Sequence, residues 1–166
     1  MRNFAYGSNL CRSRMRERVP GATFGSVTRL PMHTLRFHKR SKDESGKADA
    51  YFTGDSADEV WGVIVEVPDD ERNALDRAEG LGQGYTERDV TVYDLSGEAH
   101  QVTAYIADES AIDPSLRPYD WYKMLVVEGA RAHGLPEQYI EDLAKTEDLP
   151  DPLESRPARP MGTEPC

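Results

Sequence analysis

The 166-residue chain has few cysteines, no long hydrophobic run and fewer basic than acidic side chains. Cys11 and Cys166 lie far apart in the sequence and show no Cys-x-x-Cys or Cys/His spacing, so we expect neither a disulfide framework nor a zinc site. No stretch reaches the ~18 apolar residues that a membrane span needs, and the first residues do not resemble a secretion signal. We therefore expect a soluble, cytoplasmic protein in a reducing compartment.

The charge balance of the chain is strongly acidic. It carries 30 Asp and Glu against 20 Lys and Arg, a net charge of -10 at pH 7. Such a chain repels nucleic-acid phosphates and anionic lipids, so we expect no nucleic-acid or membrane partner and favour a small molecule. The length corresponds to one domain with a substantial core. It leaves the oligomeric state open between monomer and homodimer.

Hydrophobic periodicity predicts both strands and helices along the chain. Strands are expected at residues 4–6, 25–38 with an interruption at Pro31, 50–53, 60–67, 85–95 and 100–107. Helices are expected at residues 9–18, 71–80, 121–134 and 136–145. The polar stretch 39–50 is interpreted as a surface loop. We place the domain at residues 1–147 and a Pro-rich, acidic C-terminal tail at residues 148–166.

The segment FAYGSNL, residues 4–10, is predicted to be a junction between a strand and a helix. Gly7, Ser8 and Asn9 are turn-forming residues that follow a short apolar run and precede helix-forming residues. Backbone N–H groups at such a junction, together with the positive end of the helix dipole, can hold a carboxylate or a phosphate. The alternative is a tight turn in which Ser8 or Asn9 caps the helix.

Glu79 is unusual because it ends a predicted helix at the border of its apolar face, beside Leu75 and Ala78. A negative charge is disfavoured at a helix C-terminus and in a partly apolar environment. We therefore expect Glu79 to take up a proton more readily than an ordinary glutamate and to be suited to general-base catalysis. The alternative is a surface glutamate neutralised by Arg72 or Arg77.

Four motifs occur in one order along the chain: FAYGSNL, VWGV at 60–63, LDRAEG at 75–80 and GARAHGLPEQYIEDL at 129–143. Through them the chain resembles the gamma-glutamylcyclotransferase family from Asn3 to Lys145. The resemblance implies a mixed α/β (α+β) fold, a small mixed β-barrel flanked by helices, with a pocket at one mouth. It further implies conversion of gamma-glutamyl compounds to 5-oxoproline with neither a metal nor an organic cofactor.

The resemblance also assigns candidate site residues. Glu79 would be the catalytic acid and base, and backbone groups of the N-terminal loop would hold the glutamyl end of the substrate. Such a substrate can close a five-membered ring on its own side-chain carbonyl, so the reaction needs proton transfer but no enzyme nucleophile. The expected substrate-binding residues are Asn3, Phe4, Ala5, Tyr6, Gly7, Ser8, Asn9, Tyr105 and Tyr122.

Several functions remain open at this stage. The YGSN loop resembles the branch of the family that acts on gamma-glutamyl amino acids, rather than the glutathione-specific branch. Another branch removes gamma-glutamyl groups from acylated natural products such as aminoglycosides, and an acidic surface would tolerate a polycationic leaving group. The chain could also be a non-catalytic binding module of the same fold. Glu79 lying away from the Tyr6–Ser8 loop would favour that last alternative.

Overall fold

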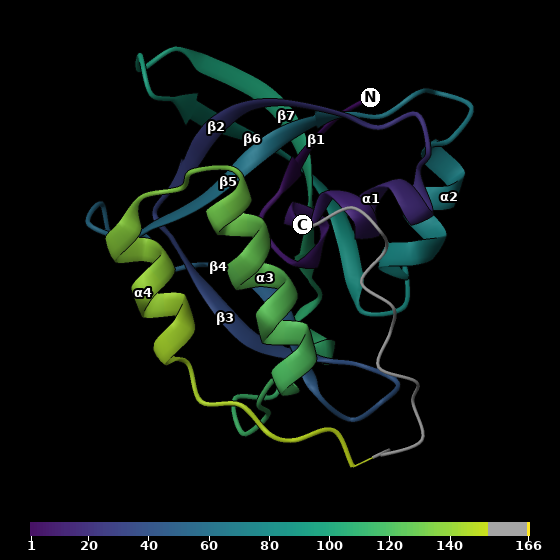
Figure 1. Ribbon diagram of the computed structural model, residues 1–166, viewed down its shortest axis with the longest axis vertical. Coiled ribbons are helices and arrows are strands. Elements are labelled where there is room, and N and C mark those ends of the chain that lie inside the picture. Colours follow the sequence, from purple (N-terminus) through teal and green to yellow (C-terminus); the bar gives the residue numbers. More distant parts are fainter. Residues whose placement is uncertain (153–165) are drawn as a thin grey trace.

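A closed five-stranded barrel lies at the centre of the computed structural model, which describes residues 1–152 and residue 166 (Figure 1). The barrel strands are β1 (Arg2–Ala5), β2 (Thr23–Pro31), β5 (Glu59–Glu66), β6 (Tyr85–Asp94) and β7 (Ala99–Ala107). A separate two-stranded sheet consists of β3 (His33–Arg40) and β4 (Gly46–Phe52). The helices are α1 (Arg12–Arg18), α2 (Arg72–Glu79), α3 (Asp120–Ala132) and α4 (Glu137–Lys145), with 3-10 turns η1 (Ser8–Leu10) and η2 (Glu109–Ala111).

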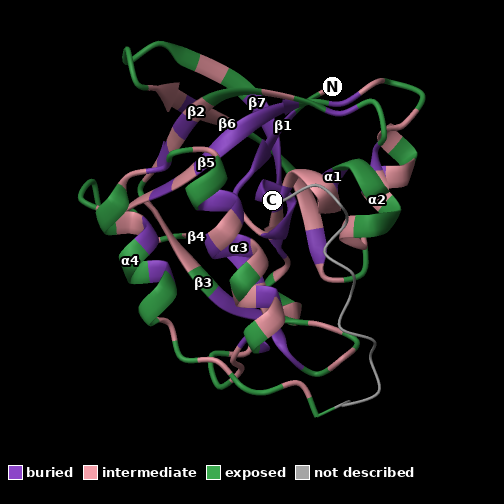
Figure 2. Ribbon diagram, viewed as in Figure 1, coloured by how far each residue is buried: buried purple, intermediate pink, exposed green. Residues whose placement is uncertain are grey.

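Strand β5 is the central strand that its apolar sequence predicts. It pairs antiparallel with both β1 and β2, and its side chains Val60, Val63 and Val65 are completely buried. Figure 2 shows the buried residues concentrated in the barrel strands and on the helix faces turned toward them. The short parallel pairing of β1 with β7 makes the barrel mixed, and there the side-chain amide of Asn3 donates to the Thr103 carbonyl at 3.0 Å.

The predicted strand region 25–38 is divided close to the expected interruption at Pro31. β2 ends at that proline, and β3 begins after Met32, which adopts a left-handed φ of 60°. The β6–β7 hairpin also confirms its sequence prediction, with Tyr85 opposite Ala107 and Tyr93 opposite Ala99. Local turn and alternation signals were therefore sufficient for these strands.

The interpretation of residues 39–50 as a surface loop is wrong. Lys39 and Arg40 end β3, and Gly46–Ala50 begin β4. Several residues of this stretch are buried, including Lys39, Ala48 and Asp49. The polar composition misled the prediction because the buried Asp49 has partners. Asp49 accepts a hydrogen bond from the Ala107 N–H at 2.7 Å and lies 2.9 Å from the His38 ring nitrogen.

The helix predicted at residues 9–18 begins later than expected. Residues 8–10 form η1, which is one turn of 3-10 helix. Helix α1 starts at Arg12, after Cys11 in an extended conformation. A three-residue turn has a small dipole. A helix dipole can therefore contribute little to anion binding at this junction. The backbone N–H groups at the start of η1 still have no acceptor within the turn and could bind an anion.

The two cysteines form a disulfide, contrary to the sequence prediction. Cys11 and Cys166 are 155 positions apart, and their Cα atoms lie 4.2 Å from each other. The Arg12 N–H also donates to the Cys166 carbonyl at 3.1 Å, and Figure 1 shows the C-terminus beside α1. Sequence spacing could not reveal this pair because only the folded chain brings its ends together.

Part of the predicted tail packs against the start of α3. The Asp120 N–H donates to the Leu149 carbonyl at 2.9 Å, and the Trp121 indole N–H donates to Asp151 at the same distance. Residues 153–165 lie outside the part of the chain that the structure describes. The domain boundary after residue 147 therefore stays a prediction.

Candidate active site

A pocket lies where the β1–η1 loop meets the C-terminal end of α2, and it encloses roughly 340 Å³ including its open mouth. Every residue that the sequence analysis assigned to the site contributes to its lining, together with two that it did not assign. The lining residues are Asn3, Phe4, Ala5, Tyr6, Gly7, Ser8, Asn9, Ala48, Glu79, Tyr85, Tyr105 and Tyr122.

Glu79 is the carboxylate among these lining residues, and one of its oxygens is firmly held. Its Oε1 atom accepts hydrogen bonds from the Asn9 amide at 2.8 Å and from the Arg18 guanidinium at 2.6 Å. The same Arg18 nitrogen donates to the Asn9 side-chain oxygen at 2.7 Å, which closes a three-residue network. The Glu79 and Arg18 side chains are 16% and 19% exposed, so this ion pair is shielded from most of the solvent.

The alternative in which Arg72 neutralises Glu79 does not apply. Arg72 pairs instead with Glu87 at 2.5 Å, and the partner of Glu79 is Arg18 from the preceding helix α1. The sequence analysis placed Arg18 in that helix but could not connect it to a residue 61 positions further along. The sequence contained only a weak indication that Arg18 belongs to the site. Helix α1 is rich in arginine, and the four-residue spacing of Arg14 and Arg18 puts both on one helix face.

Four tyrosines surround the carboxylate, and all four hydroxyls stay protonated. Burial is the main cause that raises the pKa of Tyr6, Tyr85, Tyr105 and Tyr122 above the usual value. For Tyr105, a hydrogen bond to Asp76 raises the pKa further. These side chains can donate hydrogen bonds but cannot accept a proton as bases. Among the side chains that line the pocket, Glu79 is therefore the one suited to accept a proton.

The tyrosine hydroxyls also fix the pocket wall. Tyr85 donates to the Ala48 carbonyl at 2.6 Å, and the Tyr122 hydroxyl accepts from the Ala48 N–H at 3.2 Å. Tyr6 donates to the backbone carbonyl of Tyr105. Strand β4, which supplies Ala48, thereby becomes part of the wall. Neither Ala48 nor Tyr85 was among the predicted site residues, because the start of β4 was interpreted as a loop and Tyr85 was expected only as the first residue of a strand.

The predicted loop residues use their side chains in different ways. Asn3 and Phe4 are almost completely buried within the barrel, so they can offer little to a ligand. Ser8 accepts a hydrogen bond from Arg14 at 3.0 Å, and the Asn9 side chain is engaged with Arg18 and Glu79. The contribution of this loop to a ligand is therefore expected from its backbone N–H groups.

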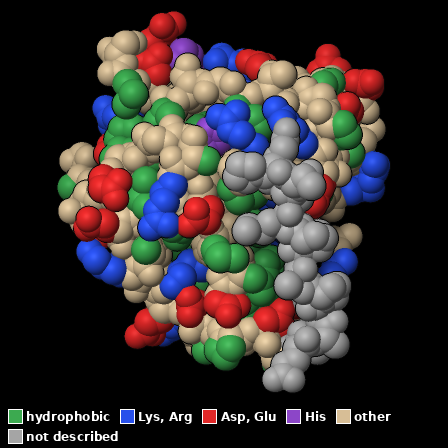
Figure 3. All heavy atoms as spheres, viewed as in Figure 1, with side chains coloured by type: hydrophobic (Ala, Val, Ile, Leu, Met, Phe, Trp, Pro, Cys, Tyr) green, Lys and Arg blue, Asp and Glu red, His purple; other side chains and the backbone are tan. Residues whose placement is uncertain are grey.

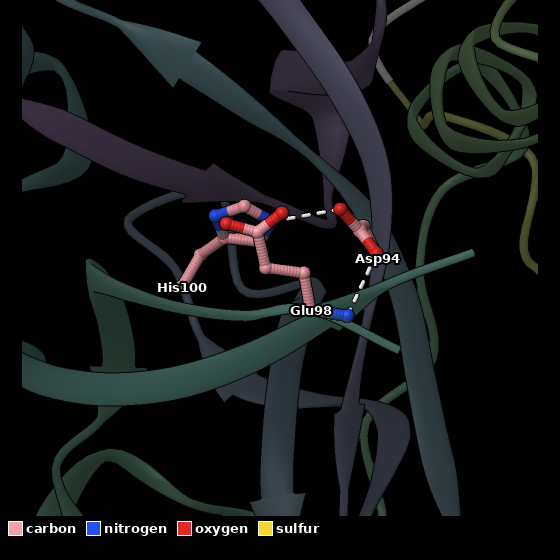
Figure 4. Close-up of side chains that lie close together, drawn as sticks. All are labelled: Asp94, Glu98 and His100. Carbon is pink, nitrogen blue, oxygen red and sulfur yellow. Dashed lines mark hydrogen bonds and ion pairs between the residues drawn. The ribbon is translucent and has the colours of Figure 1, made fainter. Parts of the chain in front are cut away.

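A second group of polar side chains lies at the β6–β7 hairpin. Figure 4 shows Asp94, Glu98 and His100 close together, and their ligand atoms lie within 4.8 Å of one another. The oxygens of Asp94 are already used, because Oδ2 lies 2.9 Å from the His100 ring and Oδ1 accepts from the Ser96 and Glu98 N–H groups. These bonds stabilise the turn, and the group is not part of the pocket.

Taken together, the fold and the pocket define a small mixed barrel with an acid–base site for a small polar ligand. The model of the AIG2-like family matches residues 59–143. The gamma-glutamylcyclotransferase of Bos taurus is 34% identical over 154 residues, covering 87% of this chain and 77% of that protein. The enzyme of the same name from Homo sapiens is 34% identical over 152 residues with the same coverage. The chain therefore belongs to the gamma-glutamylcyclotransferase family.

Solved structures agree with this assignment. A structure described as gamma-glutamyl cyclotransferase superposes with a TM-score of 0.81 at 32% identity, covering 89% of this chain and 88% of that chain. A glutathione-specific enzyme from yeast superposes with a TM-score of 0.63 at 14% identity, covering 86% and 93%. At that low identity the yeast structure shows a common fold only.

Proposed function

We propose that this protein is a gamma-glutamylcyclotransferase that converts gamma-glutamyl amino acids or amines to 5-oxoproline and releases the amine. The observation that carries the proposal is the position of Glu79, in the same pocket as the Tyr6–Ser8 loop. The relatives with this name, at 34% identity over most of the chain, support it. One oxygen of Glu79 is held by two donors, whereas the other has no hydrogen-bond partner among the described residues. A non-catalytic binding module would have no use for such a carboxylate.

The proposed reaction takes place within the substrate. The α-amine attacks the gamma-carbonyl carbon, a five-membered ring closes, and the bond between that carbon and the leaving nitrogen breaks. The amine reaches the pocket as an ammonium, so Glu79 first accepts a proton from it and then gives a proton to the departing nitrogen. The second proton that the ring nitrogen loses also ends on the released amine, which leaves as an ammonium. Neither water nor a second reactant is consumed.

Two further groups support the reaction in this proposal. The N–H groups at the start of η1 hold the substrate α-carboxylate or the oxyanion that forms at the carbonyl, and one well-placed donor contributes up to ~3 kcal/mol to the transition state. Tyr105 and Tyr122 position the substrate as parts of the pocket wall, while the Tyr105 hydroxyl itself donates to Asp76 at 2.6 Å. The pocket thus separates an anion-binding side, at the loop, from a proton-transfer side, at Glu79.

The wider setting of the enzyme is also part of the proposal. The chemistry needs no metal or organic cofactor, since ring closure and proton transfer can proceed with the side chains present. Among the described residues, none of the helices has the length and hydrophobicity needed to cross a membrane. A cytoplasmic location stays our prediction, and the Cys11–Cys166 disulfide is the observation that stands against it, because disulfides persist mainly in oxidising compartments.

The test is release of 5-oxoproline, measured by mass spectrometry. Wild type and Glu79→Gln would be compared on several gamma-glutamyl amino acids, one gamma-glutamyl polyamine and one gamma-glutamyl aminoglycoside. We expect release by the wild type and a loss of about a hundredfold or more in the folded Glu79→Gln variant, which cannot exchange the proton. Glu66→Gln, an exposed position on β5, is the matched control and should keep full activity.

Two other outcomes would change the proposal. No release from any compound, combined with thermal stabilisation by the same compounds, would indicate a binding module. Full activity of Glu79→Gln would remove Glu79 from the mechanism. The best substrate of the panel would distinguish amino acids from amines as the leaving group.

A further inference from the structure

Two lysines of the β3–β4 hairpin lie against tyrosines that line the pocket. The Lys39 ammonium is 4.6 Å from the centre of the Tyr85 ring, and the Lys47 ammonium is 4.6 Å from the centre of the Tyr122 ring. Such contacts between a cation and an aromatic face are favourable, more so away from water. The pocket therefore has a positively charged side chain behind each of two walls, in a protein whose net charge is -10.

The two lysines differ in their partners. Lys47 forms an ion pair with Asp43 at 2.9 Å and also donates to Ser45 at 2.7 Å. Lys39 is only 7% exposed, yet among the described residues it has neither a carboxylate partner nor a hydrogen-bond acceptor. The ammonium nitrogen itself is not fully buried, so it is a cation without an anionic partner that an anionic ligand can reach.

The surroundings of Lys39 connect it to the catalytic end of the pocket. Burial lowers its pKa, and the charge that most opposes this effect is the carboxylate of Glu79. The loop from Glu79 to Tyr85 packs directly on the lysine. A Cβ added at Gly84, whose φ is 111°, would lie 2.8 Å from the Lys39 Cε atom, so the glycine leaves the room that the lysine occupies.

Lys39 does not itself line the pocket, but its ammonium lies against Tyr85, which does. If the glutamyl end lies at the β1–η1 loop and the reacting atoms lie at Glu79, the leaving group extends toward Tyr85 and Lys39. In a gamma-glutamyl amino acid that part carries a carboxylate, which would give the ammonium the anionic partner that it lacks. A cationic leaving group, such as a polyamine or an aminoglycoside, would be repelled there.

We propose that Lys39 binds the carboxylate of the leaving amino acid and thereby selects gamma-glutamyl amino acids over gamma-glutamyl amines. This inference rests on the proposed function and adds a specificity-determining residue to it. Lys39 comes from the segment that the sequence analysis interpreted as a loop, so the specificity site depends on the β3–β4 hairpin.

The experiment compares two substrates that differ only in this charge, gamma-glutamyl-alanine and gamma-glutamyl-alaninamide. For each enzyme variant, kcat/KM is measured for both compounds through 5-oxoproline release. We expect the wild type to favour the acid roughly tenfold, as one charge-assisted hydrogen bond allows, with the difference mainly in KM. In Lys39→Met the ratio should fall to near one, and in Lys39→Arg the preference for the acid should persist.

The control is Lys42→Met, which removes one positive charge from an exposed position of the same hairpin. It should leave the ratio as in the wild type. The ratio compares two substrates on one preparation, so partial unfolding of a variant does not alter it. An unchanged ratio in Lys39→Met, or a wild type that does not distinguish the two compounds, would overturn the role of Lys39.

Failure of the proposed function would be recognised separately. If the wild type released no 5-oxoproline from either compound, the same pair would be measured as ligands by calorimetry. Tighter binding of the acid that disappears in Lys39→Met would still support the carboxylate site. Equal binding of acid and amide by the wild type would reject it.

Discussion

At the scale of single residues, the two oxygens of Glu79 have different environments. Oε1 takes the hydrogen bonds from Asn9 and Arg18, whereas Oε2 has no hydrogen-bond partner among the described residues. A general base needs a fixed orientation and one oxygen within reach of the substrate proton. The network with Arg18 provides the orientation, and it also balances the charge of the ionised carboxylate. Arg18 is in this view a positioning residue that acts through Glu79.

Replacing Arg18 by Met should lower kcat/KM roughly ten- to hundredfold, because a displaced base costs a large part of the proton-transfer advantage. The split between kcat and KM distinguishes this role from a purely structural one. A misplaced base slows the chemical step without weakening the contacts that hold the substrate, so the loss in Arg18→Met should appear mainly in kcat.

The control for this prediction is Arg16→Met, at an exposed position of the same helix with the same change in charge. Its kcat and KM should match those of the wild type, and Arg18→Lys should restore part of the activity. A loss in Arg18→Met that appears as much in KM as in kcat, and that Arg18→Lys does not restore, would mean that Arg18 only stabilises the local fold.

At the scale of elements, the site depends on the close packing of α3 against the turn η1. A Cβ added at Gly129 of α3 would lie 2.6 Å from the backbone carbon of Leu10, closer than such atoms approach in proteins. The glycine therefore lets the helix reach the loop directly. The same helix supplies Tyr122 to the pocket, so its distance from η1 also sets the position of one pocket wall.

Replacing Gly129 by Ala should destabilise the protein by about 1–3 kcal/mol, because the helix and the turn must move apart. The direction of the change in the free energy of unfolding is informative, since Gly→Ala at an exposed position within a helix stabilises by up to about 1 kcal/mol. Chemical denaturation gives the free energy of unfolding, and the same samples give kcat/KM. An increase in stability would show that α3 and η1 can separate at no cost.

Elements with a strong local pattern could be predicted from the sequence. The apolar run of β5, the alternation of β6 and β7 and the spacing of α2 each depend on neighbouring residues, and the structure confirms all three. The end of β3 and the start of β4 could not be predicted, because a polar residue such as Asp49 is buried through a partner far along the chain, the Ala107 N–H. The contact between Arg18 and Glu79 was also inaccessible, because it joins two helices that no sequence pattern connects.

At the scale of the whole molecule, the charged side chains are spread rather than segregated. On the face shown in Figure 3, acidic and basic side chains are interspersed over α3 and α4. The ion pairs on this face join near neighbours, such as Glu128 with Arg131 at 2.7 Å. Exposed pairs of this kind contribute little to stability. The ends of the chain contribute more, because a disulfide joins Cys11 to Cys166.

Reduction of this disulfide should lower the free energy of unfolding by about 2–4 kcal/mol, because it frees a very long loop in the unfolded chain. For a protein of this size that corresponds to a fall in Tm of several degrees. Thermal unfolding with and without a reductant measures the change. Cys166→Ser should behave like the reduced wild type and should not respond to the reductant. Two free thiols in the untreated protein would contradict the prediction.

The same bond makes the covalent structure a ring of residues 11–166 with a short N-terminal arm. A protease that cuts one peptide bond inside the ring opens it but releases no fragment. The two pieces stay covalently attached, and the arm that carries β1 stays joined to the residues on both sides of the cut. Cleaved protein would therefore keep its full mass on a non-reducing gel and separate into two pieces only after reduction.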